Sequence, residues 1–287
     1  MHIKKDYPQA MFKQLFSQKY NIIVLLALVP VSLYAQSADE QLFKQKMTLP
    51  KGETTAQTAV TIAQSFLGQP YKAGMLDAPA NEQLVCTLKD FDCWTFVETV
   101  TALAITKNSP IPDFPVFLSY LKKLRYRDAT IDGYASRLHY FKEWAVRAEQ
   151  NKIAQDMTEL LGGVPSEKLI NFMTQHRSLY PHLQKSETFS AVEKHEIDLN
   201  GYAFYYIPKA DVKNMESQIE DGDIIAITSN IAGLDFNHEG FAIRKNGRIH
   251  LLHASQEMKK VMISTEPLTD YLNRIKKHSG IAVMRLL

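Results

Sequence analysis

The spacing of hydrophobic residues changes about two thirds of the way along the chain, and this change limits the folds that the chain can adopt. Up to Thr174, apolar residues recur at the three- and four-residue intervals of helices. Beyond Ala203 they form short runs between turn residues, which is typical of strands. Asn246-Gly247 separates two such runs and is a strong hairpin signal. Helices followed by an antiparallel sheet predict an α+β domain.

The same pattern assigns individual elements. The predicted helices cover 58–66, 93–106, 115–125, a stretch within 134–150, and 165–174. The predicted strands cover 203–207, 223–228, 239–244, 248–253 and 281–286. We expect one domain over 56–287, preceded by a flexible lead-in over 36–55 that is polar and rich in lysine.

The first 35 residues have the pattern of a secretory signal peptide. Four lysines precede an apolar run over 21–35, which is short for a membrane-spanning helix and contains Pro30 near its end. We therefore expect cleavage near Ala35, an exported, periplasmic protein and no stable membrane anchor. The alternative is an uncleaved N-terminal anchor, because the basic region is long and Leu33 stands where a small residue is usual.

The charge balance argues against a nucleic-acid partner. The formal net charge is only +2, and no dense run of lysine and arginine interrupts an ordinary globular composition. The nine histidines do not form an H-E-x-x-H motif or a Cys/His cluster at ligand spacing, so we expect no metal and no other cofactor. A monomer is the expected state.

Cys93 is the best candidate for a nucleophile. Asp92 stands where a helix N-cap is expected, which puts Cys93 in the first turn of the next helix. A helix N-terminus favours a thiolate, so we expect the pKa of Cys93 to be lowered. The only other cysteine is Cys86, and a disulfide between the two is the alternative.

A base for this thiol can come from the predicted hairpin. His238 and His253 lie on its two arms, near the open end if the turn is at Asn246-Gly247. One imidazole could then orient the other, as in a nucleophile, base and orienter triad. The contact depends on strand parity, which the sequence leaves open.

Five motifs follow one another in the chain: Gly68-Gln69-Pro70-Tyr71, Phe91-Asp92-Cys93-Trp94-Thr95-Phe96-Val97-Glu98, Asp221-Gly222-Asp223-Ile224-Ile225, Asn237-His238-Glu239-Gly240 and Leu252-His253-Ala254-Ser255. Their order resembles that of the NlpC-type papain-like cell-wall cysteine peptidases. The residues after Cys93 and the segment 134–141 resemble one branch, the N-acetylmuramoyl-L-alanine amidase-like family, whose members look specialised for anhydro-muropeptides. The similarity runs from about Thr58 to the C-terminus and implies a papain-like fold.

The resemblance also implies roles for individual residues. Cys93 would attack the carbonyl joined to L-alanine, His238 would act as base and then acid, and His253 would orient it. Tyr71 would help to bind the oxyanion together with the Cys93 N–H. Trp94 departs from the wider group, in which a small residue often follows the cysteine.

Four further residues, in or beside the motifs, are candidates for contact with substrate: Asp92, Ser136, Arg137 and Asn237. An arginine suits a carboxylate of the stem peptide, although a pair with a protein acid such as Glu98 or Glu143 is an equally good explanation of Arg137.

The expected substrate is thus a soluble peptidoglycan fragment, cleaved between N-acetylmuramic acid and L-alanine. A γ-D-glutamyl-diaminopimelate endopeptidase could use the same three catalytic residues. A non-catalytic peptidoglycan-binding module is the third possibility, and the intact Cys93, His238 and His253 argue against it.

Overall fold

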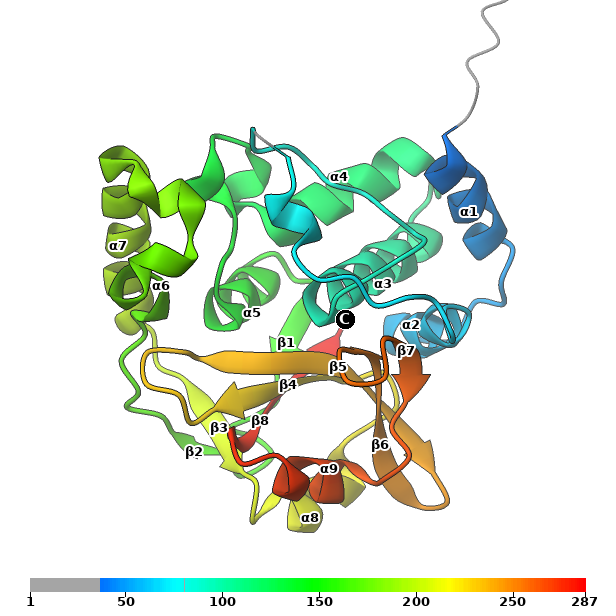
Figure 1. Ribbon diagram of the computed structural model, residues 1–287. Helices are drawn as coiled ribbons and strands as arrows, with labels where there is room; N and C mark the ends of the chain where they lie inside the picture. Colours follow the sequence, from blue (N-terminus) through cyan, green and yellow to red (C-terminus); the bar gives the residue numbers. More distant parts are fainter. Residues whose placement is uncertain (1–36, 80) are drawn as a thin grey trace, which may run out of the picture. The chain divides into compact units, whose positions relative to one another are not determined.

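The computed structural model of the protein describes residues 37–79 and 81–287 (Figure 1). The predicted signal segment and its cleavage near Ala35 lie outside the described residues. The helices are α1 (Ala38–Met47), α2 (Thr55–Gln64), α3 (Cys93–Asn108), α4 (Phe114–Arg125), α5 (Phe141–Gln150), α6 (Phe172–Gln175), α7 (Ser186–Asn200), α8 (Val212–Met215) and α9 (Leu268–Arg274). In this part of the chain, none of them is long and apolar enough to cross a membrane.

The strands form one antiparallel sheet, which confirms the predicted α+β class. Their bounds are β1 (Ala154–Asp156), β2 (Val164–Pro165), β3 (Tyr205–Pro208), β4 (Ile224–Ser229), β5 (Phe236–Lys245), β6 (Arg248–Ser255), β7 (Lys260–Ile263) and β8 (His278–Leu286). The order across the sheet is β2-β3-β8-β4-β5-β6-β7, and β1 pairs with β8. The long strands β4, β5, β6 and β8 therefore make its centre.

Both faces of the central strands are covered by apolar side chains. Phe241 and Ile243 of β5 point to the face that packs against α3, whereas Ala242 between them points to the face that packs against α9. This alternation is the two-residue period of a strand buried on both sides. The site residues of β5 are therefore divided between the two faces according to their position along the strand.

The predicted hairpin is present between β5 and β6. Lys245 pairs with Arg248, and both turn residues have positive φ angles, 52° at Asn246 and 78° at Gly247. A two-residue turn of this type requires positive φ at both positions, which Asn and Gly tolerate best. The turn fixes the register that brings the two histidine-bearing arms together.

The prediction of a flexible lead-in over 36–55 is wrong for residues 38–47, which form α1. The Ser37 hydroxyl caps α1 by accepting from the Glu40 N–H at 3.1 Å. Phe43 is 2% exposed, with its ring 5.4 Å from that of Phe114 and 5.5 Å from that of Phe117. One aromatic anchor thus orders a polar helix whose sequence shows little amphipathic pattern.

The prediction of a helix over 165–174 is also wrong. Val164 and Pro165 form β2, paired with β3, and only Phe172–Gln175 is helical. Between them the Ser166 N–H donates to Phe204, and Ile170 forms a bridge with Gly233. Pairing with distant segments therefore overrides the local helical spacing.

Candidate active site

Asp92 caps α3 and so fixes the position of Cys93 at its first turn, as the sequence predicts. The Asp92 carboxylate accepts from the Thr95 N–H at 2.8 Å, and the Thr95 hydroxyl accepts from the Asp92 N–H at 3.0 Å. This reciprocal capping box satisfies two donors at the start of the helix. Below it, Phe96 is fully buried among the rings of Phe66, Phe91 and Phe241. Cys93 is therefore held in place by a capped helix and by closely packed aromatic side chains.

The expected lowering of the Cys93 pKa is wrong. Burial raises the pKa of the thiol well above its ordinary value, and the carboxylates of Glu239 and Asp92 raise it further. The backbone N–H groups of Glu239 and Trp94 point to the sulfur and oppose this effect without reversing it. The resting residue is therefore a neutral thiol, because desolvation of the anion outweighs the helix N-terminus.

Glu239 is a site residue that the sequence interpretation missed. Its side chain is 3% exposed, on the α3 face of β5, and it makes a hydrogen bond with Cys93. Burial, together with the carboxylates of Asp92, Glu98 and Asp235, raises its pKa well above the ordinary value. The sequence did contain a signal for this residue, because Glu239 directly follows His238. Neighbouring residues on a strand point to opposite faces of the sheet, so Glu239 could be expected on the other face from His238.

The predicted contact between the two hairpin histidines is present. His238 Nε2 lies 2.5 Å from His253 Nδ1 in a hydrogen bond, and the two rings are nearly perpendicular. Tyr271 of α9 packs beside both, with its ring 6.3 Å from His238 and 5.6 Å from His253. The ring of His278, which the sequence did not single out, lies 5.6 Å from that of Tyr271. Bonding through Nε2 leaves Nδ1 as the nitrogen of His238 that can take a proton.

Burial also keeps these histidines neutral. It lowers the pKa of His238 well below the usual value, helped by the nearby His253, His278 and Lys277. Burial alone lowers the pKa of His253 to about 4. A neutral thiol and a neutral imidazole pair are therefore the resting state, in contrast to a thiolate and imidazolium pair.

Cys93 and His238 both lie at the start of β5. The sulfur meets the β5 backbone at the Glu239 N–H, and His238 is the preceding residue, with its ring on the α9 face. The position of the thiol and that of the imidazole pair therefore both depend on the peptide unit between His238 and Glu239.

Tyr71 lies close to this thiol. It bridges to Phe91, just before the capping residue, and its N–H donates to the Lys259 carbonyl. Burial raises the pKa of the Tyr71 phenol, and Cys93, Asp92 and Glu239 raise it further. The phenol is therefore protonated at neutral pH and can donate a hydrogen bond.

The other predicted substrate-binding residues are engaged within the protein. Arg137 is 4% exposed and forms ion pairs with Asp77 and Glu82, each at 3.0 Å, which are neither of the acids considered from the sequence. The Ser136 hydroxyl closes a turn by donating to Gly133 at 2.7 Å. Their role in substrate binding stays a prediction.

Asn237 differs from these residues, because it keeps an unused acceptor next to His238 in the chain. Its amide N–H donates weakly to Lys277 at 3.3 Å, and its Oδ1 is buried with no partner among the residues that the structure describes.

Both cysteines are free thiols. Burial raises the pKa of Cys86 to about 12, which makes it a poor nucleophile at neutral pH. No group of three or more His, Cys, Asp or Glu side chains within 37–79 and 81–287 is placed to hold a metal ion.

The family model described as N-acetylmuramoyl-L-alanine amidase-like matches residues 61–281. Among solved structures, an N-acetylmuramoyl-L-alanine amidase from Bacteroides uniformis is 36% identical, with a TM-score of 0.77 over 81% of this chain and 98% of that one. A putative xylanase from Bacteroides fragilis is 36% identical, with a TM-score of 0.74 over 78% of this chain and 99% of that one.

A protein from Legionella pneumophila shares the fold at 24% identity, with a TM-score of 0.66 over 88% of this chain and 94% of that one. No curated protein matches the chain. The matched range spans most of the domain and includes Cys93, His238 and His253. The chain therefore belongs to the N-acetylmuramoyl-L-alanine amidase-like family.

Proposed function

We propose that the protein is an exported cysteine-dependent amidase with an NlpC-type, papain-like site, which hydrolyses the bond between N-acetylmuramic acid and L-alanine in soluble peptidoglycan fragments. The observation that carries this proposal is the His238–His253 hydrogen bond at the strand that meets the Cys93 thiol. Family membership supports the choice of an amide bond.

The reaction begins from neutral groups. His238 accepts the Cys93 proton as the sulfur attacks the carbonyl of the lactyl group, so that the charge develops only during attack. His253 holds the His238 ring through their 2.5 Å hydrogen bond. His238 then protonates the leaving amine of L-alanine, and water attacks the thioester that remains on Cys93 with His238 again as base.

Hydrogen-bond donors must stabilise the negatively charged oxygen of the tetrahedral intermediate. Tyr71 is protonated and lies near the thiol, and the Cys93 N–H is at the free end of α3, where the first N–H groups of a helix are not used within it. These two groups form the proposed oxyanion site.

Substitution tests the thiol mechanism. Cys93→Ala should abolish hydrolysis of a defined muropeptide, because the nucleophile is lost. Cys86→Ala is the matched control and should keep the parent rate, since Cys86 is not part of the site. Equal turnover by Cys93→Ala and the parent would disprove cysteine catalysis.

Product analysis decides which bond is cut. Mass spectrometry should detect an intact stem peptide that begins with L-alanine. A product split within the peptide would instead identify a γ-D-glutamyl-diaminopimelate endopeptidase. Parallel incubation with sacculi and with soluble anhydro-muropeptides tests the preference for fragments, which activity on sacculi alone would exclude.

A further inference from the structure

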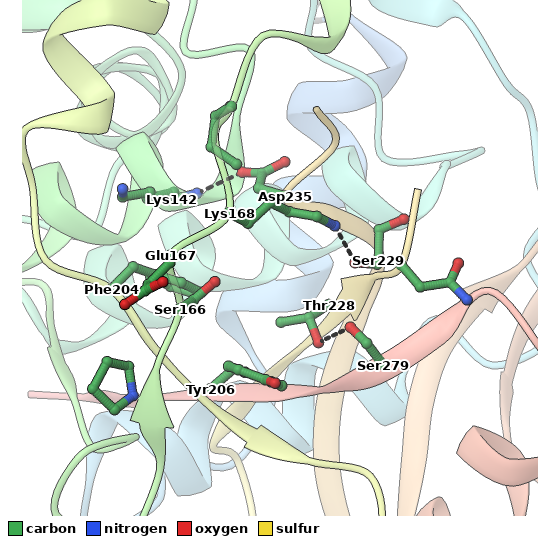
Figure 2. Close-up of a pocket in the computed structure, with 13 residues that line it drawn as sticks. Lys142, Ser166, Glu167, Lys168, Phe204, Tyr206, Thr228, Ser229, Asp235 and Ser279 are labelled. Atoms are coloured by element: carbon green, nitrogen blue, oxygen red, sulfur yellow. Dashed lines mark hydrogen bonds between the residues drawn. The ribbon is translucent and has the colours of Figure 1, made fainter. Parts of the chain in front are cut away.

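A pocket of about 600 Å³ lies apart from the residues described above (Figure 2). Its walls come from α5, from the segment between β2 and α6, and from the adjoining ends of β3, β4 and β8. Six of its lining residues carry the argument: Lys142, Lys168, Phe204, Thr228, Asp235 and Ser279. None of them belongs to the catalytic group described above.

Aromatic rings connect this pocket with the nucleophile. Trp94, next to Cys93, packs against Phe141 at 6.3 Å between ring centroids. Phe141 packs against Phe236 at 4.8 Å, and Phe236 packs against Phe204 of the pocket wall at 5.3 Å. The strand register agrees, because Ile227 pairs with His238 and its neighbour Thr228 lines the pocket. The pocket therefore lies beside the start of β5, the strand that carries His238.

Most of the charges in the pocket are already satisfied by the protein. The Asp235 carboxylate accepts the N–H groups of Lys142 at 2.9 Å and Phe236 at 2.8 Å. The Lys168 ammonium donates to the carbonyls of Ser229 and Leu234. Glu167 is exposed at the rim, where water screens its charge.

Lys142 is the exception. Its side chain is 5% exposed, and its ammonium has no hydrogen bond or ion pair within 37–79 and 81–287; the Phe204 ring lies 6.0 Å away, and the Asp235 carboxylate is near enough to act on its pKa. Partial burial lowers the pKa of Lys142, because it disfavours the charged form. An anionic ligand beside the ammonium would favour the charged form. The hydroxyls of Thr228 and Ser279 share one hydrogen bond at 2.8 Å, which leaves one further O–H donor on the opposite wall.

We infer that this pocket binds a carboxylate of the stem peptide through Lys142, and so positions the muropeptide for Cys93. The inference rests on the proposed function. The ligand chemistry is that of an acidic peptide whose carboxylate ends beside the Lys142 ammonium. A neutral sugar would leave that ammonium unpaired.

Binding to the inactive Cys93→Ala protein tests the pocket without turnover. The probe is L-alanyl-γ-D-glutamyl-diaminopimelate, compared with the same peptide with its carboxylates amidated. The acid peptide should bind at least about tenfold more tightly, the effect of one charged hydrogen bond in a buried site. Adding Lys142→Met should remove this difference, and Lys123→Met on α4 is the control that should keep it.

Melting temperatures show whether each variant is folded. Ser166→Trp, which fills the pocket from a half-buried wall position, is the second variant and should weaken the acid peptide equally. Retained preference for the acid peptide in both pocket variants would overturn the inference. If the parent enzyme cleaves muropeptide while Lys142→Met binds both peptides like the parent, only the pocket assignment fails. If the parent is inactive but binding depends on Lys142, only the amidase proposal fails.

Discussion

Asp92 has two separable effects on the active site, and substitution can divide them. As the N-cap of α3 it holds the first turn, and as a carboxylate it raises the pKa of Cys93. Asn keeps an oxygen in the capping position and removes the charge, whereas Ala removes both. The pair Asp92→Asn and Asp92→Ala therefore separates capping from electrostatics.

The structure gives the size of the capping effect. Both bonds from Thr95, the N–H at 2.8 Å and the hydroxyl at 2.7 Å, end on Asp92 Oδ1, so an Asn side chain can accept both. Thr95 is only 3% exposed, and Ala would leave its N–H without a partner. We expect Asp92→Ala to lower the free energy of unfolding by about 2 kcal/mol and the melting temperature by about 4–8 °C. For Asp92→Asn we expect a change within about 0.5 kcal/mol.

The thiol pKa is measured from the rate of alkylation by iodoacetamide as a function of pH, in a Cys86→Ala background. Both substitutions should lower the pKa of Cys93, since both remove the negative charge. Asp113→Ala, which removes the exposed cap of α4, should cost about 1 kcal/mol and leave the Cys93 pKa unchanged. An Asn variant as unstable as the Ala variant, or an unchanged thiol pKa in both, would refute the reasoning.

Three other predictions follow from the site and the fold. His253→Ala should lower kcat for muropeptide at least 100-fold with little change in KM, because His238 loses its orienting bond; a changed KM alone would contradict this. The acid limb of kcat/KM should lie below pH 6.5, because burial lowers the pKa of His238 and protonation removes the base; a limb at the ordinary histidine value would count against it. Phe43→Ala should cost about 3 kcal/mol in thermal unfolding, whereas a flexible lead-in would tolerate it.

The sequence predicted the parts of the fold that depend on local signals. Asp92 before an apolar stripe predicted the start of α3, and Asn246-Gly247 predicted the hairpin that brings His238 and His253 together. Both signals act over a few residues, and their physical cause lies in those residues themselves. They were also enough to name the three proposed catalytic residues.

Features that depend on distant contacts were not predictable. α1 is ordered by Phe43 against two rings of α4, and the segment after Val164 is held by β3. The prediction of a lowered Cys93 pKa was wrong for the same reason. The helix N-terminus is visible in the sequence, but the burial of the thiol against Glu239 depends on how β5 packs on α3.

The unpaired Lys142 and the proposed catalytic residues lie on different segments of the chain. The pocket is built by α5, the stretch around Ser166 and Lys168, and the loop before Asp235, whereas the thiol and imidazoles stand on α3 and on the hairpin. Of these pocket residues, only Asp235 directly precedes the strand that carries His238. A substitution at Lys142 can therefore alter the proposed binding of substrate without replacing a residue proposed to react.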